Sequence, residues 1–301
     1  MTELSTFWHF WVSAIVIGSM IGCAILLIYA KRGQKYNEET DQTTGHSYDG
    51  IEELDNPLPK WWNMFFWSTI FFGFGYILIY GVGGWTGFSD WSSYGQWEEE
   101  VAKAEEKYKP YYDKLNAMTI EELATNEEAL ATGQRIFASN CAVCHGPTAS
   151  GSEGFPNLTD NDWLYGGSPA AIKQTLLNGR NGAMPANGLK PDMTDAERND
   201  IVAHVLTLSG REAKQGDAAN GKALFAQACA ACHGADGSGM QAIGAPNLTD
   251  NIWLYGGSEA KINFTIRHGR AGVMPAWKDI LGEDKIHVLS AYVYSLSLDK
   301  E

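Results

Sequence analysis

The chain is 301 residues long, more than one ordinary domain needs, and it carries a formal net charge of −14. This acidic balance argues against nucleic acid as a partner, because nucleic-acid-binding surfaces are basic. Five cysteines are present, and four of them form two C-x-x-C pairs that lie far apart in the sequence. The odd count and the wide separation argue against the disulfide framework of a small secreted protein.

Two apolar segments near the N-terminus are each long enough to cross a membrane as a helix. No Asp, Glu, Lys or Arg occurs from Leu4 to Ala30 or from Trp61 to Ser89, and about 20 such residues span a bilayer. Tryptophans cluster near one end of both segments, as they do at a headgroup boundary. The N-terminus is not basic, which disfavours a cleaved signal peptide. We expect membrane helices over about 5–30 and 61–83, within an anchor that covers 1–97.

The positive residues around these segments predict how the anchor is oriented. Every Lys and Arg before residue 98 lies in the loop 31–60, and the outer flanks 1–6 and 82–97 contain none. Because positively charged loops stay in the cytoplasm, we expect this loop to be cytoplasmic. The rest of the chain then lies on the other side, which in a bacterium is the periplasm. The expected location is the bacterial inner membrane, with lipid around both helices.

Residues 98–125 are rich in Glu and Lys at helical spacings, which is typical of a solvated helix. Pro110 is expected to break or kink this helix, because proline lacks the backbone N–H that the helix needs. We interpret the segment as a charged helical linker between the anchor and the C-terminal part of the chain.

From residue 126 onward the chain contains the same pattern twice, which indicates an internal repeat. The first copy has Cys141-Ala-Val-Cys-His145, and the second has Cys229-Ala-Ala-Cys-His233. Both copies continue, in the same order, with Pro-Asn-Leu-Thr-Asp-Asn, Trp-Leu-Tyr-Gly-Gly-Ser and Gly-x-Met-Pro-Ala. Each copy is long enough for one small domain, especially where a cofactor supplies part of the core.

We therefore expect two tandem domains, 126–213 and 214–301. Capping signals before their apolar segments predict that most of their elements are helices. A glycine on the first helix of each copy, Gly133 or Gly221, predicts a close crossing with the last helix of that copy. The expected fold is mainly α: two transmembrane helices followed by two tandem all-α domains.

The C-x-x-C-H segments are the attachment signature of c-type haem. Two thiols three residues apart on a helical turn face the same side, so they can form thioethers to one edge of a haem. The histidine that follows can then give a nitrogen to the iron. The residues are Cys141, Cys144 and His145 in the first copy, and Cys229, Cys232 and His233 in the second.

A methionine is expected as the second axial ligand of each iron, because a thioether together with His raises the reduction potential of haem. Met184 and Met274 both lie in the repeated Gly-x-Met-Pro-Ala segment, which distinguishes them from the other methionines of the chain. We predict that Met184 completes the iron site of His145, and that Met274 completes the site of His233. No catalytic residue is expected, since neither iron then has an open position.

Further repeated residues are expected around each haem. The carbonyls of Pro156 and Pro246 are candidates to accept the other ring N–H of the two histidines and so fix the tautomer. A set of aromatic and Arg residues is expected to hold the haem propionates, or the aromatic rings merely line the pocket. These residues are Trp163, Tyr165 and Arg180 in the first copy, and Trp253, Tyr255 and Arg270 in the second.

Two other chemistries are compatible with C-x-x-C pairs. A zinc site made from both pairs would need them brought together and would leave the repeated His and Met unexplained. A redox-active dithiol would need a thioredoxin-like βαβ pattern, which the sequence lacks.

The C-x-x-C-H, Pro-Asn-Leu and Met-Pro elements of both copies resemble class I cytochrome c domains. The segment Leu54-Asp-Asn-Pro-Leu-Pro-Lys-Trp-Trp62, with the aromatic-rich span after it, resembles the start of the di-haem subunit III (CcoP) of cbb3-type cytochrome c oxidases. The simpler family pattern has one anchor helix, so the span within 4–30 departs from it.

This resemblance implies two covalently bound haem c groups and a role as an electron relay in respiration. The implied partners are a catalytic subunit with haem b and copper, a mono-haem c subunit, and a donor cytochrome c. The chain alone would then exchange electrons, and oxygen reduction would belong to the complex. Two alternatives remain open: a catalytic di-haem peroxidase, which would need one iron to lose its distal ligand, and a haem subunit of a periplasmic dehydrogenase.

Overall fold

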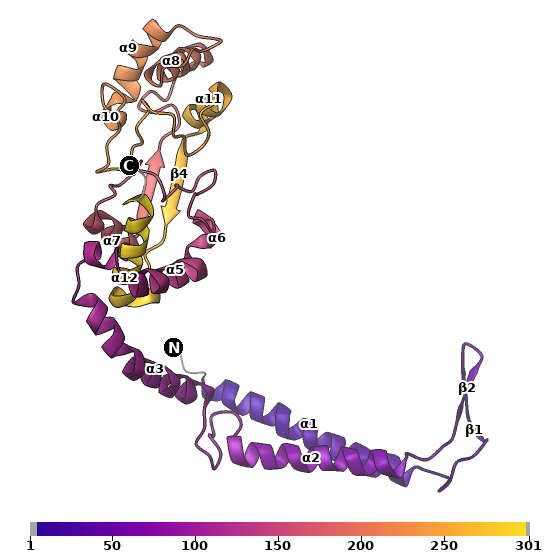
Figure 1. Ribbon diagram of the computed structural model, residues 1–301. Helices are drawn as coiled ribbons and strands as arrows, with labels where there is room; N and C mark the ends of the chain where they lie inside the picture. The colour runs from indigo at the N-terminus through magenta and orange to yellow at the C-terminus, as the bar shows by residue number, and fades with distance from the viewer. Residues whose placement is uncertain (1–4, 299–301) are drawn as a thin grey trace. The chain divides into compact units, whose positions relative to one another are not determined.

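The computed structural model describes residues 5–298 and divides into two compact units, Met1–Lys107 and Tyr108–Glu301. Helices dominate both units, and the described residues contain only two short antiparallel strand pairs (Figure 1). The prediction of a mainly α fold that begins with two membrane helices is confirmed.

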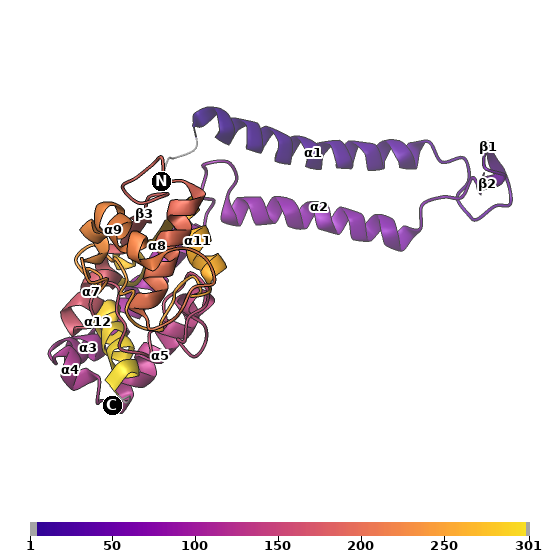
Figure 2. The same cartoon turned by 90° about the horizontal axis from the view of Figure 1, so that it is seen from above.

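The first unit is built on two long apolar helices, α1 (Thr6–Arg32) and α2 (Lys60–Tyr80), which lie side by side (Figure 2). Both are long and apolar enough to cross a membrane, and only 6% of either apolar stretch is buried within the protein. So much exposed apolar surface is suited to lipid rather than to water. Gly73 allows the helices to approach, because a Cβ there would lie 2.8 Å from the terminal methyl of Met20.

The loop between α1 and α2 carries a hairpin of β1 (Thr43–Tyr48) and β2 (Ile51–Leu54), whose residues are all exposed. Beyond α2 the chain turns at Gly81, which has φ +84° and sits so close to Trp85 that a Cβ would lie 1.8 Å from the Trp85 carbonyl oxygen. Only glycine fits this conformation, which explains why α2 ends at Tyr80 rather than at residue 83 as expected.

The predicted charged linker forms α3 (Ser93–Asn116) and the short helix α4 (Ile120–Leu123). α3 runs through Pro110 without the expected break. The end of the linker is also not merely solvated, because Leu115 and Leu123 are fully buried in a cluster with Val288 of the last helix. The final part of this segment is therefore packed into the second unit, which begins at Tyr108.

The second unit continues with helices that mostly begin after a polar residue whose side chain caps them. Asn126, Ser168 and Ser258 each accept a hydrogen bond from a first-turn backbone N–H, and Thr194 forms a complete capping box. In chain order the elements are α5 (Glu127–Asn140), α6 (Ala142–His145), α7 (Pro169–Asn178), β3 (Arg180–Met184), α8 (Asp195–Leu208), α9 (Ala218–Ala228), α10 (Ala230–His233), α11 (Glu259–His268), β4 (Arg270–Met274) and α12 (Lys278–Leu298).

The two sequence copies exchange their last helices. In Figure 1, α12 of the second copy lies with α5 and α7 of the first, and α8 of the first copy lies with α9 and α11 of the second. The strands β3 and β4 run between the two groups and pair antiparallel, with Arg180 opposite Met274 and Met184 opposite Arg270. We call α5, α6, α7 and α12 the first module, and α8, α9, α10 and α11 the second module.

Glycine contacts show the exchange at atomic scale. A Cβ on Gly133 of α5 would lie 2.5 Å from the Tyr292 Cβ of α12, and a Cβ on Gly221 of α9 would lie 1.9 Å from the Asp200 carbonyl oxygen of α8. The close helix crossings predicted at these glycines are therefore present, but each partner helix comes from the other copy. The boundaries 126–213 and 214–301 separate the sequence repeats and do not separate the packed modules.

Each module has its own hydrophobic core. The first contains Phe137, Ile172, Leu176, Ile286, Leu289 and Val293, and the second contains Ile201, Val202, Val205, Leu206, Phe225, Ile262 and Ile266. Both lists draw on both sequence copies, because each core is closed by the exchanged helix.

Candidate functional site

Each C-x-x-C-H segment lies on a tight helical turn next to the core of its module. In the first module the N–H groups of Cys144 and His145 both donate to the Cys141 carbonyl, at 3.1 and 3.0 Å. The turn keeps Cys141 buried and Cys144 exposed, while His145 is 9% exposed. The second module repeats these hydrogen bonds at 3.1 and 3.0 Å around the Cys229 carbonyl. Two sulfurs and one imidazole are thus presented together in each module.

Both histidine rings are held by a proline carbonyl. The Nδ1 atom of His145 lies 3.0 Å from the Pro156 oxygen, and the Nδ1 atom of His233 lies 3.1 Å from the Pro246 oxygen. Because a carbonyl only accepts, Nδ1 carries the proton in both rings and Nε2 carries the lone pair. This tautomer leaves Nε2 available to bind a metal, and the contacts expected at both prolines are present.

The first cysteine of each C-x-x-C pair is a poor candidate for thiolate chemistry. Burial, with a smaller effect of the neighbouring cysteine, raises the pKa of Cys141 and of Cys229 to about 11. Burial also lowers the pKa of His233, although its hydrogen bond to Pro246 opposes that shift. A neutral imidazole and protonated thiols disfavour a redox dithiol, which needs a thiolate at neutral pH.

The geometry also disfavours a shared zinc site. Cys141 belongs to the hydrophobic cluster of the first module, and Cys229 packs against that of the second. Within residues 5–298 no group of three or more His, Cys, Asp or Glu side chains is arranged to hold a metal ion. The four sulfurs are therefore not gathered into the tetrahedral set that structural zinc requires.

The loop that begins at Met184 belongs to the second module. Met184 packs against the same cluster as Cys229. Just beyond it, the Asn187 N–H donates to the Ile266 carbonyl of α11 at 2.7 Å, and the Leu189 N–H donates to the Ala228 carbonyl of α9 at 3.0 Å. This loop is thus fastened to helices of the second sequence copy.

The loop that begins at Met274 belongs to the first module in the same way. Met274 packs against the cluster that contains Cys141, and the Trp277 N–H donates to the Leu176 carbonyl of α7 at 2.9 Å. The predicted pairing of each methionine with the histidine of its own copy therefore needs correction. The antiparallel pairing of β3 with β4 carries each methionine into the module of the other copy.

The predicted Arg and Tyr residues stack on each other in both copies. The Arg180 guanidinium lies 4.6 Å from the Tyr165 ring centre, and that of Arg270 lies 4.1 Å from the Tyr255 ring centre. Tyr165 also reaches Gly244, where an added Cβ would lie 2.2 Å from the ring. These pairs therefore lie beside β3 and β4, where the two modules meet.

Arg211 is a residue that the sequence comparison missed. Its guanidinium lies 4.9 Å from the Trp253 ring centre, and its Nη1 donates to the Gly257 carbonyl at 2.7 Å. Its Nη2 and the Trp253 Nε1 are buried without an acceptor, although buried donors normally have one. Two donors without acceptors, next to the hydrophobic cluster against which Cys229 also packs, fit an anionic group such as a haem propionate. The repeat gave no signal for Arg211, because its counterpart in the second copy, Asp299, is not an arginine.

Comparison with known proteins gives the family. Residues 40–86 match the N-terminal domain of cytochrome oxidase-cbb3, FixP, and residues 128–205 and 216–293 each match the cbb3-type cytochrome c oxidase subunit III. The chain is 45% identical to the cbb3-type cytochrome c oxidase subunit CcoP of Rubrivivax gelatinosus over 96% of its own length and 95% of that protein. It is 43% identical to the subunit FixP of Bradyrhizobium sp. (strain ORS 278) over 84% of its length and 94% of that protein. The chain thus belongs to the subunit III family of cbb3-type cytochrome c oxidases, whose members include CcoP and FixP.

Proposed function

We propose that this chain binds two haem c groups covalently and relays single electrons as a subunit of a cbb3-type oxidase. The observation that carries the proposal is the pair of C-x-x-C-H turns, each with a buried imidazole oriented by a proline carbonyl. A methionine packs against the same core as each turn. Haem held in this way supplies one-electron chemistry at the iron.

The proposed ligand sets follow the exchanged modules. In the first module Cys141 and Cys144 would hold the haem covalently, and His145 and Met274 would bind its iron. In the second module Cys229 and Cys232 would hold the haem covalently, and His233 and Met184 would bind its iron. The packing of each methionine loop against the other copy supports this assignment.

The surrounding residues have three tasks in this proposal. The proline carbonyls hold the imidazoles in one tautomer, and the apolar cores keep water away from the axial positions. Trp163, Tyr165, Arg180, Trp253, Tyr255 and Arg270, together with Arg211, supply donors and rings at the haem edges. A site with two axial ligands has no open position, so the chain itself is proposed to catalyse nothing beyond electron exchange.

The family name supports a place in a larger complex. We propose that the chain assembles with a catalytic subunit that holds haem b and copper, and with a mono-haem c subunit. Electrons would enter from a donor cytochrome c, for which the charge of −14 provides electrostatic attraction if that donor is basic. The flow would end at the catalytic subunit, where oxygen is reduced to water with proton pumping.

The membrane arrangement is proposed from the charged flanks. α1 and α2 would cross the bacterial inner membrane, with the loop 31–60 in the cytoplasm and the haem modules in the periplasm. The concentration of Lys and Arg in that loop supports this orientation.

The proposal is tested by purifying the chain from native membranes in a mild detergent. We expect two haems per chain that stay attached after denaturing electrophoresis, a c-type reduced-minus-oxidised spectrum, and oxidase subunits among the co-purified chains. Loss of all haem on denaturation, or bound zinc in its place, would contradict the proposal. Turnover of peroxide by the isolated chain would instead favour an open haem site.

A further inference from the structure

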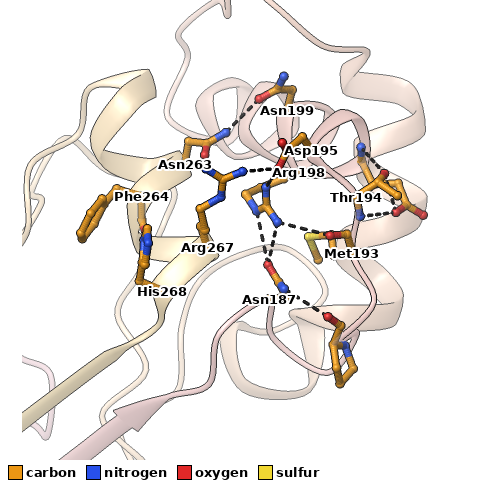
Figure 3. Close-up of polar contacts among 12 residues, drawn as sticks. Asn187, Met193, Thr194, Asp195, Arg198, Asn199, Asn263, Phe264, Arg267 and His268 are labelled. Carbon is orange, nitrogen blue, oxygen red and sulfur yellow. Dashed lines mark hydrogen bonds and ion pairs between the residues drawn. The ribbon is translucent and has the colours of Figure 1, made fainter.

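The loop after Met184 is tied down by a buried guanidinium. Arg198 of α8 is only 4% exposed, and Figure 3 shows it pointing at the loop from the start of the helix. Its Nη2 and Nε atoms donate to the Asn187 side-chain oxygen at 3.0 and 3.3 Å, and Nη2 also donates to the Met193 carbonyl at 3.2 Å. Nη1 forms an ion pair with Asp195.

One side chain therefore holds both ends of the loop. Asn187 is three residues beyond Met184, and Met193 is the last residue before the cap of α8. Asn187 is fixed from two further directions, since its N–H donates to the Ile266 carbonyl at 2.7 Å and its Nδ2 donates to the Pro191 carbonyl at 3.3 Å. The planar guanidinium matches this set of acceptors better than a single ammonium could.

The other methionine loop is held by different chemistry. In the repeat, the position of Arg198 is taken by Ile286, which is fully buried, and that of Asn187 by Trp277. Trp277 packs against the same apolar cluster as Ile286. The Met274 loop thus relies on apolar packing, whereas the Met184 loop relies on a charged, directional network.

We propose that Arg198 and Asn187 form a clamp that keeps Met184 bound to the haem iron of the second module. Both are positioning residues, because they act through the loop that carries the ligand. The inference rests on the proposed function, since it requires a haem iron for Met184 to bind. Its consequence is that the two methionines can be released independently: loss of the clamp frees Met184 and leaves Met274 in place.

The test uses the full, haem-loaded chain and titrates the oxidised protein with imidazole, which displaces a weakly held methionine. In the Arg198→Leu variant we expect half of the haem to bind imidazole at a concentration at least about tenfold lower than in the unaltered chain. The reason is that a hydrogen bond to a charged group is worth at least that factor. The other half of the haem should be unchanged. Arg198→Lys and Asn187→Ala should lower the imidazole concentration needed by the same half of the haem. These two variants replace Arg198→Leu if that variant does not fold.

The matched control is Arg267→Gln, which removes an ion pair to the same Asp195; within residues 5–298 the Arg267 side chain forms no hydrogen bond to the loop. This variant should bind imidazole as the unaltered chain does. In a Met184→Ala background Arg198→Leu should add nothing, whereas in a Met274→Ala background its full effect should remain.

An effect that persists without Met184, or that affects both haems equally, would overturn the clamp. Covalently attached haem with an unchanged imidazole affinity in all three clamp variants would also overturn it, while leaving the proposed function intact. A chain without covalent haem would instead remove the proposed function itself.

Discussion

At the scale of single residues, one hydrogen bond determines which ring nitrogen of each buried histidine can bind a metal. The carbonyls of Pro156 and Pro246 keep Nδ1 of the two histidines protonated and so leave Nε2 as a ligand. Pro156 and Pro246 also line a cavity of about 340 Å³, and Asp162 is a titratable residue in the same lining.

Asp162 should make the folded state less stable as pH rises. Burial first, and then the negative charges of Asp250 and Asp160, raise the pKa of Asp162 to about 6. A carboxyl group whose pKa is higher in the folded state than in the unfolded state favours folding when protonated, and this contribution is lost as pH rises through about 6. Asp162→Asn should therefore raise the melting temperature at pH 8, with little change at pH 4.

Thermal unfolding followed by circular dichroism at both pH values measures this difference. Glu121→Gln, at an exposed position on α4, is the control and should show no such dependence. An equal shift of Asp162→Asn at pH 4 and pH 8 would mean that ionisation of Asp162 is not the cause.

At the scale of elements, the short β3–β4 pair determines which helices and ligands come together. Its antiparallel register places the end of each strand beside the start of the other. A Cβ on Gly179 would lie 2.3 Å from the Met274 carbonyl oxygen, and a Cβ on Gly269 would lie 2.3 Å from that of Met184. Both glycines have φ near +70°, so each crossing depends on a residue without a side chain.

The exchanged ligand pairing predicts which methionine serves which haem. In a chain with Cys141→Ala and Cys144→Ala, only the haem of the second module stays covalently attached. Met184→Ala should then abolish the absorption band that a methionine–iron bond gives the oxidised protein, and Met274→Ala should leave the band in place. Pairing within each copy predicts the opposite result, so one spectrum of each variant distinguishes the two arrangements.

The reciprocal chain is the control for this experiment. With Cys229→Ala and Cys232→Ala, the band should depend on Met274 and not on Met184. Loss of the band in both methionine variants of one chain would show that the substitutions disturb the fold rather than the ligand.

At the scale of the whole second unit, the exchange makes two sequence repeats into one inseparable body. Each core is closed by a helix from the other repeat, and each fully buried large apolar side chain contributes about 1.5–3 kcal/mol. Phe137 and Leu289 in the first module, and Ile201 and Phe225 in the second, are among the side chains at these crossings. Separating the repeats would expose both cores at once.

A protease site inserted after Gln215, where the connection between the repeats is exposed, tests this directly. After cleavage the two halves should remain together through size-exclusion chromatography and separate only on denaturation. Two independent tandem domains would come apart as soon as the connection is cut. The same insertion without protease treatment shows whether the added residues themselves disturb the chain.

The amino-acid sequence by itself determined the chemistry of this protein, because that chemistry is local. The two C-x-x-C-H turns, the Met-Pro segments, the helix caps and the two apolar spans each lie within a few consecutive residues, so spacing alone identified them. The end of the linker was misjudged, since Leu115 and Leu123 are buried against another helix where the local pattern indicated a solvated helix.

Only the tertiary structure decided which repeat completes which site. The copies are so alike that Met184 or Met274, and α8 or α12, could close either module by sequence alone. The choice depends on the β3–β4 register and on contacts such as that of Asn187 with Ile266, which join residues far apart in the chain. Arg198 and Arg211 were missed for the same reason, because their roles lie in partners that no local pattern reveals.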